Sequence, residues 1–372
     1  MLTGYTVKGF KSFASETAVE MKAKNYKILS DTNVADGVLK GCMFIGANAS
    51  GKSNIVLALK LLLDLLFANT DVSLKNYLCK FSIGDELMLR YCFQIEGKEI
   101  EYAVEYDNAK SVTIEKLIVE GEQLLDRIGS GAADTISGKK NTYDNIPDGS
   151  LILREIYFNS KFRSNGTLKA WFDFLMNSVY IDLYKQKIFS YKDTDLGTIE
   201  FLSRGGAEKI NAFFKKYSFG QTIEYDEGAE KSSRISFKRD GINARIPFGL
   251  ESLGNQNLLS LLPKFFYVIE NGGLLILDEF SSGFHNDLEE LLIRYFMKNA
   301  EKAQLIFVSH STNLLSNRLL RPDQIYTIDF ETDRGSVINR VSNQQPREGQ
   351  NLEKMYLGGV FDGLPKYNDI AE

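Results

Sequence analysis

The chain has 372 residues, of which 44% are hydrophobic and 25% are charged, and its formal net charge is −5. This length and composition are those of an ordinary globular protein, with room for one large α/β domain or a core with an inserted lobe. The acidic balance argues against a nucleic-acid binder that is basic over its whole surface, although it leaves room for a local basic face.

The cysteines and the apolar runs indicate the compartment. Cys42, Cys79 and Cys92 form no CxxC pair, so a reduced cytosol fits them better than a disulfide framework or a zinc site. The first residues alternate polar and apolar and lack the charged head and apolar run of a signal peptide. The longest apolar run, residues 61–68, is broken by Asp64 and is too short to span a bilayer. We therefore expect a soluble cytoplasmic protein with no membrane partner.

The N-terminal part leads into a Gly-rich loop. Residues 1–23 have the two-residue period of strands and pass through a polar loop, 23–37, to a short apolar strand at 42–45. The next eight residues, GANASGKS, match the pattern G-x-x-x-x-G-K-[ST] at every fixed position, and a Leu-rich helix follows them. An ordinary Gly-rich turn is the alternative, and the flanking strand and helix make it the weaker one. Strand, loop and helix N-terminus is the arrangement that binds nucleotide phosphates.

Each residue type in this loop suits that chemistry. The glycines let backbone N–H groups turn inward around phosphate oxygens. Lys52 is expected to reach the β- and γ-phosphates, and the Ser53 hydroxyl to ligate Mg²⁺. We expect ATP contacts from Gly46, Asn48, Ala49, Ser50, Gly51, Lys52, Ser53 and Asn54.

Beyond the loop the pattern alternates between strands and helices. Alternating runs from 86 to 120 predict an antiparallel meander, and the Gly/Ser/Asn/Asp-rich stretch 126–150 predicts a surface loop. Helical spacing over 168–184 and 199–217 predicts an inserted helical lobe, followed by strands in 221–248 and an α/β block in 250–330. We therefore divide the chain into 1–150, with the phosphate loop and meander; 151–220, the lobe; and 221–372, the remaining motifs.

A second signal is the run Gly272 to Glu279. Its four consecutive apolar residues predict a strand buried on both faces, as in a parallel sheet, with two carboxylates at its C-terminal end. Asp278 suits a hold on Mg²⁺ opposite Ser53, and Glu279 suits the orientation or deprotonation of an attacking water. A strand that ends in a solvated acidic turn is the alternative.

A third signal is the apolar strand 305–308, which ends in Ser309 and His310. It follows the acidic strand after a helix at 287–298, as in a βαβ unit. His310 is expected to contact the γ-phosphate or the attacking water, although a lone histidine is more often structural.

The fourth signal is Ser252-Leu253-Gly254 ahead of a helix at 258–270. A helix N-terminus is a ready anion site, so Ser252 and Gly254 are candidates for phosphate contacts. A helix-capping serine followed by a turn glycine explains the same residues at least as well.

The order of these motifs resembles that of ABC-class ATPases. The phosphate loop with its trailing Asn54 looks like the SMC, RecF and OLD side of that class rather than the transporters. The C-terminal half is similar to the short stand-alone ABC-class ATPases, grouped with AAA proteins, of bacterial phage-defence and abortive-infection loci. The resemblance covers 1–70 and 247–366, and its matching runs are 249–254, 277–280, 304–310, 321–326, 356–359 and 363–365.

This resemblance implies an ABC-type ATPase head, an α/β fold with a mixed P-loop sheet, an antiparallel β subdomain and an inserted helical lobe. It implies that two heads form a head-to-tail homodimer, or a higher even oligomer, around ATP. Lys52 and Ser53 of one head then hold the phosphates, and Ser252 and Gly254 of the other close over the γ-phosphate. Glu279 activates water and His310 senses the γ-phosphate, so ATP and Mg²⁺ are the expected cofactors and hydrolysis separates the heads.

Three departures from the family pattern stand out. The loop after Glu279 lacks the usual Asp, which puts cross-talk between the two sites in doubt. No glutamine loop can be placed, because Gln94 lies in a strand pattern and no other Gln falls between 54 and 122. Leu253 and Asn255 replace the small or hydroxyl residues usual around the signature, which predicts slow hydrolysis.

These features favour a slow, regulated ATPase subunit that controls a separate effector, a nuclease or toxin, in phage defence. The tail beyond Tyr326 is too short for an appended nuclease or Toprim domain, which makes a partner in trans attractive. The main alternative is a RecF/SMC-like DNA-binding repair ATPase, with the basic and aromatic segment 161–171 as a nucleic-acid contact or, more simply, an amphipathic helix. A small-molecule phosphotransferase would use the same phosphate loop, but the ordered set of motifs argues against it. A nucleotide-dependent scaffold with negligible turnover also fits these motifs.

Overall fold

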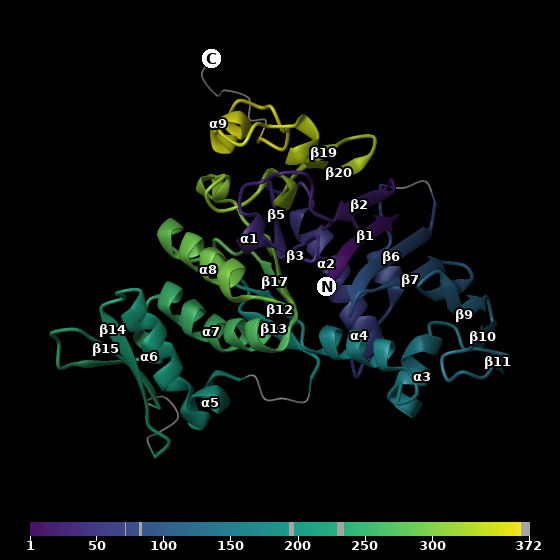
Figure 1. Ribbon diagram of the computed structural model, residues 1–372, viewed down its shortest axis with the longest axis horizontal. Helices are drawn as coiled ribbons and strands as arrows, with labels where there is room; N and C mark the ends of the chain where they lie inside the picture. The colour runs from purple at the N-terminus through teal and green to yellow at the C-terminus, as the bar shows by residue number, and fades with distance from the viewer. Residues whose placement is uncertain (71, 82–83, 193–196, 229–233, 366–372) are drawn as a thin grey trace.

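The computed structural model describes residues 1–70, 72–81, 84–192, 197–228 and 234–365. Two large sheets dominate the fold, a mixed sheet at the centre and an antiparallel sheet beside it (Figure 1). The α/β fold with a mixed P-loop sheet and an antiparallel subdomain is therefore confirmed. How the chain divides into domains stays a prediction.

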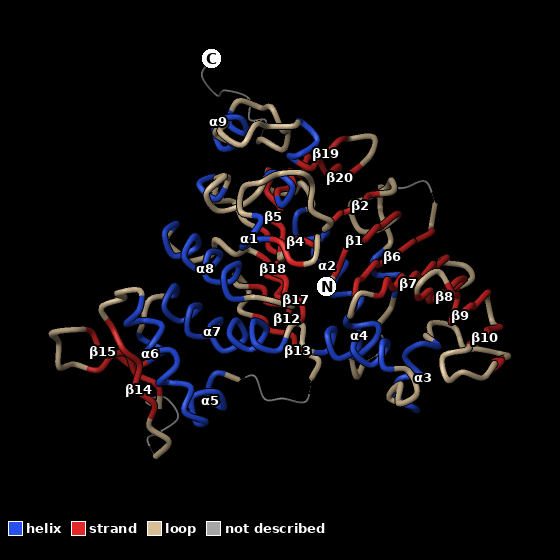
Figure 2. The backbone as a smooth tube through the Cα atoms, viewed as in Figure 1, coloured by secondary structure: helices blue, strands red, loops and turns tan. Residues whose placement is uncertain are grey.

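The central sheet has the strand order β13-β12-β17-β18-β5-β19-β20 within the described residues (Figure 2). Its inner strands are parallel and its two edge strands are antiparallel. Strands β5, β17 and β18 are buried along their whole length, as their continuous apolar runs predict. The bounds are β12 (Val179–Asp182), β13 (Lys187–Ser190), β17 (Gly273–Asp278), β18 (Ala303–Val308), β5 (Gly41–Gly46), β19 (Ile325–Glu331) and β20 (Gly335–Arg340).

The antiparallel sheet has the order β11-β10-β9-β8-β7-β6-β1-β2 within the described residues. It contains the predicted N-terminal strands and the predicted meander. Its strands are β1 (Leu2–Lys8), β2 (Thr17–Glu20), β6 (Glu86–Ile95), β7 (Lys98–Asp107), β8 (Ser111–Val119), β9 (Glu122–Ile128), β10 (Gly131–Asp134) and β11 (Asn141–Tyr143).

The surface loop predicted at 126–150 is wrong over much of its length, because β9, β10 and β11 extend the meander there. Strands β10 and β11 have only four and three residues, too few for a hydrophobic period to reveal them, and β9 begins ahead of the stretch, at Glu122. Side-chain hydrogen bonds join them: Tyr143 Oη donates to Asp134 Oδ2 (2.7 Å), and Asn141 Nδ2 donates to the same carboxylate (3.1 Å).

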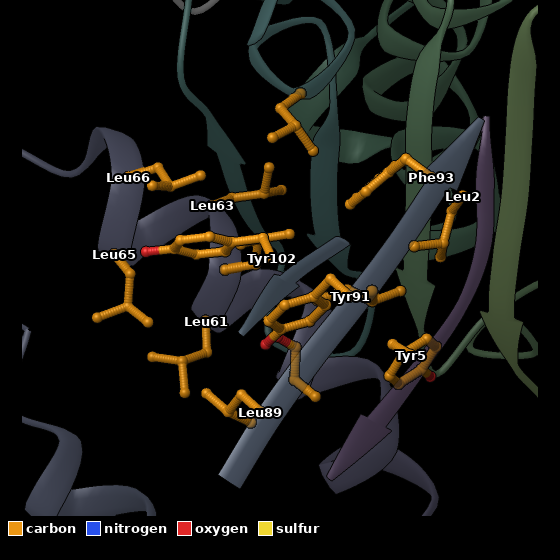
Figure 3. Packing of buried hydrophobic residues seen from close by; sticks show 14 of the residues in the cluster. Leu2, Tyr5, Leu61, Leu63, Leu65, Leu66, Leu89, Tyr91, Phe93 and Tyr102 are labelled. Carbon is orange, nitrogen blue, oxygen red and sulfur yellow. The ribbon is translucent and has the colours of Figure 1, made fainter. Parts of the chain in front are cut away.

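Helix α2 (Lys52–Phe67) lies between the two sheets and forms much of the first core. In Figure 3 its leucines Leu61, Leu63, Leu65 and Leu66 lie beside Tyr91 and Tyr102 of the antiparallel sheet. Tyr91 Oη also donates to the Ala58 carbonyl (2.7 Å), which fixes the helix against β6. Despite these apolar runs, no helix in the described part of the chain has the length and apolarity needed to cross a membrane.

Alternate side chains of β17 enter two different cores. Leu274 and Ile276 pack in the core that contains α2 and the antiparallel sheet. Leu275 and Leu277 pack in a second core with helices α7 (Leu253–Asn271) and α8 (Asn286–Asn299). The central sheet is thus covered on both faces, and the edge formed by the carboxyl ends of its parallel strands lies between the two covering layers.

The segment predicted as a helical lobe is only partly helical. Helix α3 (Ile152–Ser160) and helix α4 (Gly166–Met176) form as expected, and Trp171 of α4 is fully buried. The single helix predicted from Leu168 to Tyr184 is wrong after Met176, because β12 pairs in parallel with β17. The apolar run at 179–183 is too short for its period to separate a strand from a helix.

The remaining elements are α1 (Ser30–Asn33), β3 (Val34–Ala35), β4 (Val38–Leu39), α5 (Thr198–Phe201), α6 (Ala207–Lys216), β14 (Gln221–Tyr225), β15 (Ile235–Arg239), β16 (Arg245–Pro247) and α9 (Leu352–Leu357). Of these, β3 and β4 pack on the first core, and α6, β14, β15 and α9 contribute side chains to the second core. The helix predicted at 199–217 is interrupted at 202–206, where Gly205 has φ 83°. Strands appear as predicted within 221–248, of which residues 229–233 lie outside the described part.

Candidate nucleotide-binding site

Three neighbouring parallel strands carry the predicted motifs to one edge of the central sheet. Strands β5, β18 and β17 are adjacent, and their carboxyl ends lead to the phosphate loop, to His310 and to Asp278 respectively. Because parallel strands end at the same edge, side chains more than 200 residues apart meet there, as the Ser53–Asp278 hydrogen bond shows.

The phosphate loop holds two residues in left-handed backbone conformations. Ala49 has φ 63° and Gly51 has φ 105°, so the loop can turn successive N–H groups toward one point. A Cβ on Gly51 would lie 2.2 Å from Ser336 Oγ and 2.6 Å from Ser12 Oγ, which leaves room only for glycine. At the tip of the loop, Asn48 and Ala49 are exposed.

Two serines outside the motif support this loop. Ser336 Oγ lies within hydrogen-bond distance of both the Ser50 carbonyl and Ser12 Oγ, 2.6 Å in each case. Asn54 Nδ2 donates to Ser12 Oγ (2.8 Å). The trailing Asn54 therefore fastens the start of α2 to the N-terminal segment. Sequence reasoning missed Ser12 and Ser336, because no local pattern connects residues 324 positions apart.

Lys52 is buried inside its own loop. Its Nζ donates to the carbonyls of Gly46 (2.9 Å) and Ala47 (2.6 Å). Burial lowers the pKa of Lys52, and the carboxylates of Glu279 and Asp278 oppose this effect. An ammonium group held in this way can exchange backbone carbonyls for phosphate oxygens with little rearrangement.

Ser53 and Asp278 form a pair of oxygen donors. Ser53 Oγ donates to Asp278 Oδ1 (3.0 Å), and Tyr180 Oη of β12 donates to Asp278 Oδ2 (3.2 Å). Burial raises the pKa of Asp278, whereas the hydrogen bond from Ser53 lowers it. A hydroxyl and a carboxylate oxygen side by side match the hard-oxygen ligands that Mg²⁺ prefers, so these residues fit the ion.

Glu279 and His310 form the next pair. Glu279 has φ 55°, an uncommon conformation for a non-glycine residue, and its Oε2 lies 3.6 Å from His310 Nε2. The His310 side chain holds the pKa of Glu279 below its ordinary value, against the effect of burial. The backbone N–H of His310 donates to Ser281 Oγ (3.3 Å), which connects the two loops. An ionised carboxylate beside an imidazole is equipped to accept a proton from water.

Ser252 and Gly254 lie at the start of α7. Ser252 caps the helix, since its Oγ accepts from the Asn255 N–H (3.3 Å), and its side chain is exposed. A Cβ on Gly254 would lie 2.4 Å from the Gly283 carbonyl, so α7 is packed tightly against the loop that follows Glu279. Within the described residues, no hydrogen bond joins Ser252 or Gly254 to residues 46–54 of the same chain.

Strand β12 adds a side of the site that sequence reasoning missed. Asp182 lies opposite Asp278 in the β12–β17 register, and Tyr180 contacts Asp278 directly. In the segment after β12, Gln186 Nε2 donates to Asn257 Oδ1 of α7 (3.2 Å). The signal that could have found these residues is the apolar run before Asp182, which the predicted helix over 168–184 includes.

Comparison with known proteins identifies the fold. The sequence model of a family described as "AAA domain, putative AbiEii toxin, Type IV TA system" matches residues 43–316. No curated protein matches the chain. A solved SmcHead bound to the C-winged helix domain of ScpA is 14% identical, with a TM-score of 0.54, and the match covers 92% of this chain and 99% of that one. The SMC head domain from Thermotoga maritima is 17% identical, with a TM-score of 0.49 and coverage of 91% and 97%. The likeness to the solved SmcHead, with its TM-score of 0.54, shows that this chain has an SMC-head fold.

Proposed function

Because this chain belongs to the AAA-domain family of that description, a group of ABC-class ATPases, we propose that it hydrolyses ATP between two copies of itself. We also propose that this cycle controls a separate effector protein, a nuclease or toxin, in defence against phage. The observation that carries the ATPase proposal is the convergence of Lys52, Ser53, Asp278 and Glu279 at one edge of the sheet. The toxin–antitoxin system in the family's description supports the defence role.

Each residue of the site has a part in the proposed reaction. The loop N–H groups and Lys52 bind the phosphates, while Ser53 and Asp278 would hold Mg²⁺. The ion, when bound, neutralises charge on the phosphate oxygens. Glu279 accepts a proton from the attacking water, and His310 positions Glu279 and contacts the γ-phosphate.

The location of Ser252 supports a site shared between two copies. Its hydroxyl is exposed at a helix N-terminus and has no described contact with the phosphate loop of its own chain. Leu250 and Leu253 beside it are 79% and 54% exposed. Such exposure of large apolar side chains is typical of a surface that a partner covers in the assembled protein. In a head-to-tail homodimer this N-terminus faces the partner's γ-phosphate, where backbone N–H groups stabilise an anion.

A second candidate function, a DNA-binding repair ATPase, is favoured by the SMC-head fold. The basic and aromatic segment 161–171 does not add to it. Phe162 and Trp171 are buried in the core, so their rings offer no face on which a base could stack. Stimulation of ATP hydrolysis by DNA, with binding that weakens steeply as salt increases, would favour this second function.

Glu279→Gln tests the reaction. Glutamine keeps the shape of the side chain but cannot accept a proton, so ATP hydrolysis should fall about 10²- to 10⁴-fold while ATP still binds. An ATP-bound dimer should then accumulate, which light scattering after size exclusion measures. Glu208→Gln, on the exposed side of α6, is the matched control. A variant that remains monomeric at saturating ATP would contradict the dimer mechanism.

Mixing two inactive variants tests whether the site is shared. In a mixture of Lys52→Ala and Ser252→Arg chains, one of the two sites of each heterodimer contains an intact Lys52 and an intact Ser252. Random pairing should therefore restore about one quarter of the wild-type rate. A mixture of Lys52→Ala and Glu279→Gln chains is the control, because these two residues serve the same site and no intact combination forms. No recovery in the first mixture would place Ser252 in its own chain's site.

A further inference from the structure

A cavity of about 660 Å³ lies along one side of α2, and the reaction just described does not use it. Leu57, Lys60, Asp64 and Phe67 line it, and their spacing of three or four residues puts them on one face of the helix. No residue of the phosphate loop, 46–53, lines the cavity. Its volume is in the range of small-molecule sites.

Part of the lining of the cavity is a buried polar network. Lys60 Nζ lies 2.5 Å from Asp64 Oδ2, and both side chains are nearly buried. Tyr191 Oη donates to Asp64 Oδ1 (2.6 Å). The Lys60 ammonium group therefore neutralises the Asp64 carboxylate. This carboxylate does not offset the positive charges of the other lysines that line the cavity.

The lining of the cavity is positively charged. Lys11, Lys60, Lys161 and Lys192 line it, and Asp64 is the one carboxylate among the described lining residues. Lys161 Nζ lies 4.5 Å from the ring centroids of both Tyr157 and Phe158, and Lys161 is exposed. Lysines around a concave surface raise the local concentration of anions and suit phosphate groups.

Aromatic rings accompany these lysines. Phe158 and Phe189 line the cavity and are 46% and 36% exposed, although large apolar rings usually bury more of their surface. The Lys60 ammonium group lies 4.0 Å from the Phe189 ring centroid. Exposed rings beside lysines are the combination that stacks a nucleobase and holds its phosphate.

The cavity is also connected to the candidate magnesium ligand. The Tyr180 ring centroid lies 5.9 Å from Lys60 Nζ, and the hydroxyl of the same tyrosine donates to Asp278 Oδ2. Helix α2 itself runs without interruption from Lys52 to Phe67. A ligand that displaces Lys60 or Phe189 therefore acts on Asp278 through a single side chain.

We propose that this cavity binds a phosphorylated nucleoside, which stacks on Phe158 or Phe189 with its phosphate against Lys161, and that occupancy regulates ATP hydrolysis through Tyr180. The binding part is independent of the reaction at the phosphate loop. The regulatory part rests on the proposed ATPase function.

Binding is tested in the whole 372-residue chain with the change Lys52→Ala, which is expected to stop the phosphate loop from holding nucleotide. Isothermal titration with AMP, GMP, CMP and dTMP, and with a single-stranded DNA pentanucleotide, should identify at least one ligand. Phe189→Ala and Lys161→Glu, each added to Lys52→Ala, should weaken its binding about 5- to 100-fold. Lys139→Glu, the same charge change at an exposed site outside the cavity, should leave binding unchanged.

Binding of a mononucleotide identifies the free nucleotide as the ligand, and binding of the pentanucleotide alone identifies a nucleic-acid strand. Absence of binding by every probe at millimolar concentration overturns the proposal, as does binding that neither cavity variant weakens. Lys161 is exposed, so Lys161→Glu reports on binding even if Phe189→Ala destabilises the fold.

Regulation is tested with a chain that has an intact Lys52. The ligand should change the ATPase rate, and Tyr180→Phe should bring the ratio of the rates with and without ligand close to one while ligand binding persists. A ratio that Tyr180→Phe leaves unchanged overturns the proposed route. A chain without ATPase activity that still binds the ligand contradicts the proposed function and leaves the cavity assignment standing.

Discussion

Gly254→Ala tests the contact between the start of α7 and the loop after Glu279. The added Cβ would lie 2.4 Å from the Gly283 carbonyl oxygen, whereas real Cβ atoms stay beyond 3.0 Å, so the two segments must separate by at least about half an ångström. The neighbour is backbone and cannot rotate away. Overpacking of this kind costs about 1–3 kcal/mol, and alanine regains about 0.5–1 kcal/mol as the better helix residue.

We therefore expect Gly254→Ala to lower the free energy of unfolding by about 0.5–2 kcal/mol, measured by urea denaturation. ATP hydrolysis should fall more than ATP affinity, because the phosphate loop is untouched while Glu279 lies at the other end of the displaced loop. Gly166→Ala, at the start of α4, is the matched control, since no heavy atom beyond its own residue, its two chain neighbours and the backbone of its own helix lies within 4 Å of a Cβ at this position. If both variants are equally stable and equally active, the contact has neither structural nor catalytic weight.

Two further changes probe the acidic residues. Tyr180→Phe removes the donor to Asp278 Oδ2, so the pKa of Asp278 should increase further. The Mg²⁺ concentration that gives the half-maximal ATPase rate should then increase about tenfold. An unchanged Mg²⁺ requirement would contradict this role of Tyr180 in supporting a metal ligand. Burial raises the pKa of Glu289 on α8 from 4.5 to about 7. Between these two pH values the folded state therefore binds more protons than the unfolded state. The free energy of unfolding should then decrease as the pH increases through this range. Glu289→Gln should remove this decrease in the free energy of unfolding, which amounts to up to about 3 kcal/mol. Urea denaturation at pH 5 and pH 8 measures it, and a pH dependence that persists in the variant would contradict the prediction.

The parts of the site that could be predicted from sequence are those in which one strand carries the signal. The phosphate loop, the Asp278–Glu279 pair and His310 each follow a continuous apolar run, and parallel strands end at a common edge. The N-terminal strands and the meander were predictable for a similar reason, since their two-residue alternation is long.

The other parts depend on contacts that no local pattern encodes. Strand β12 is a strand because β17 pairs with it, and its apolar residues alone fit a helix equally well. Backbone pairing and the Asp134 carboxylate join strands β9 to β11, and only a few apolar side chains, such as Leu125, pack them on the first core, which is too few to give a clear period. The run at 321–326, which carries part of the family resemblance, contains the buried ion pair between Arg321 Nε and Asp323 Oδ1 (2.9 Å). Motif similarity alone does not separate such structural residues from ligand-binding ones.

The packing of Gly254 on Gly283 also bears on communication between sites. In the proposed dimer, Glu279 serves the ATP bound to its own chain, whereas Ser252 and Gly254 serve the ATP bound to the partner. These two groups belong to different sites, yet in one chain they are joined by a backbone contact in which a methyl group does not fit. Asn257 Nδ2 reinforces this contact by donating to the Ser282 carbonyl (3.1 Å). A movement of α7 as one site closes therefore displaces the loop that carries Glu279, the general base of the other site. This steric route needs no Asp in the loop, so its absence from residues 280–285 is compatible with coupled hydrolysis.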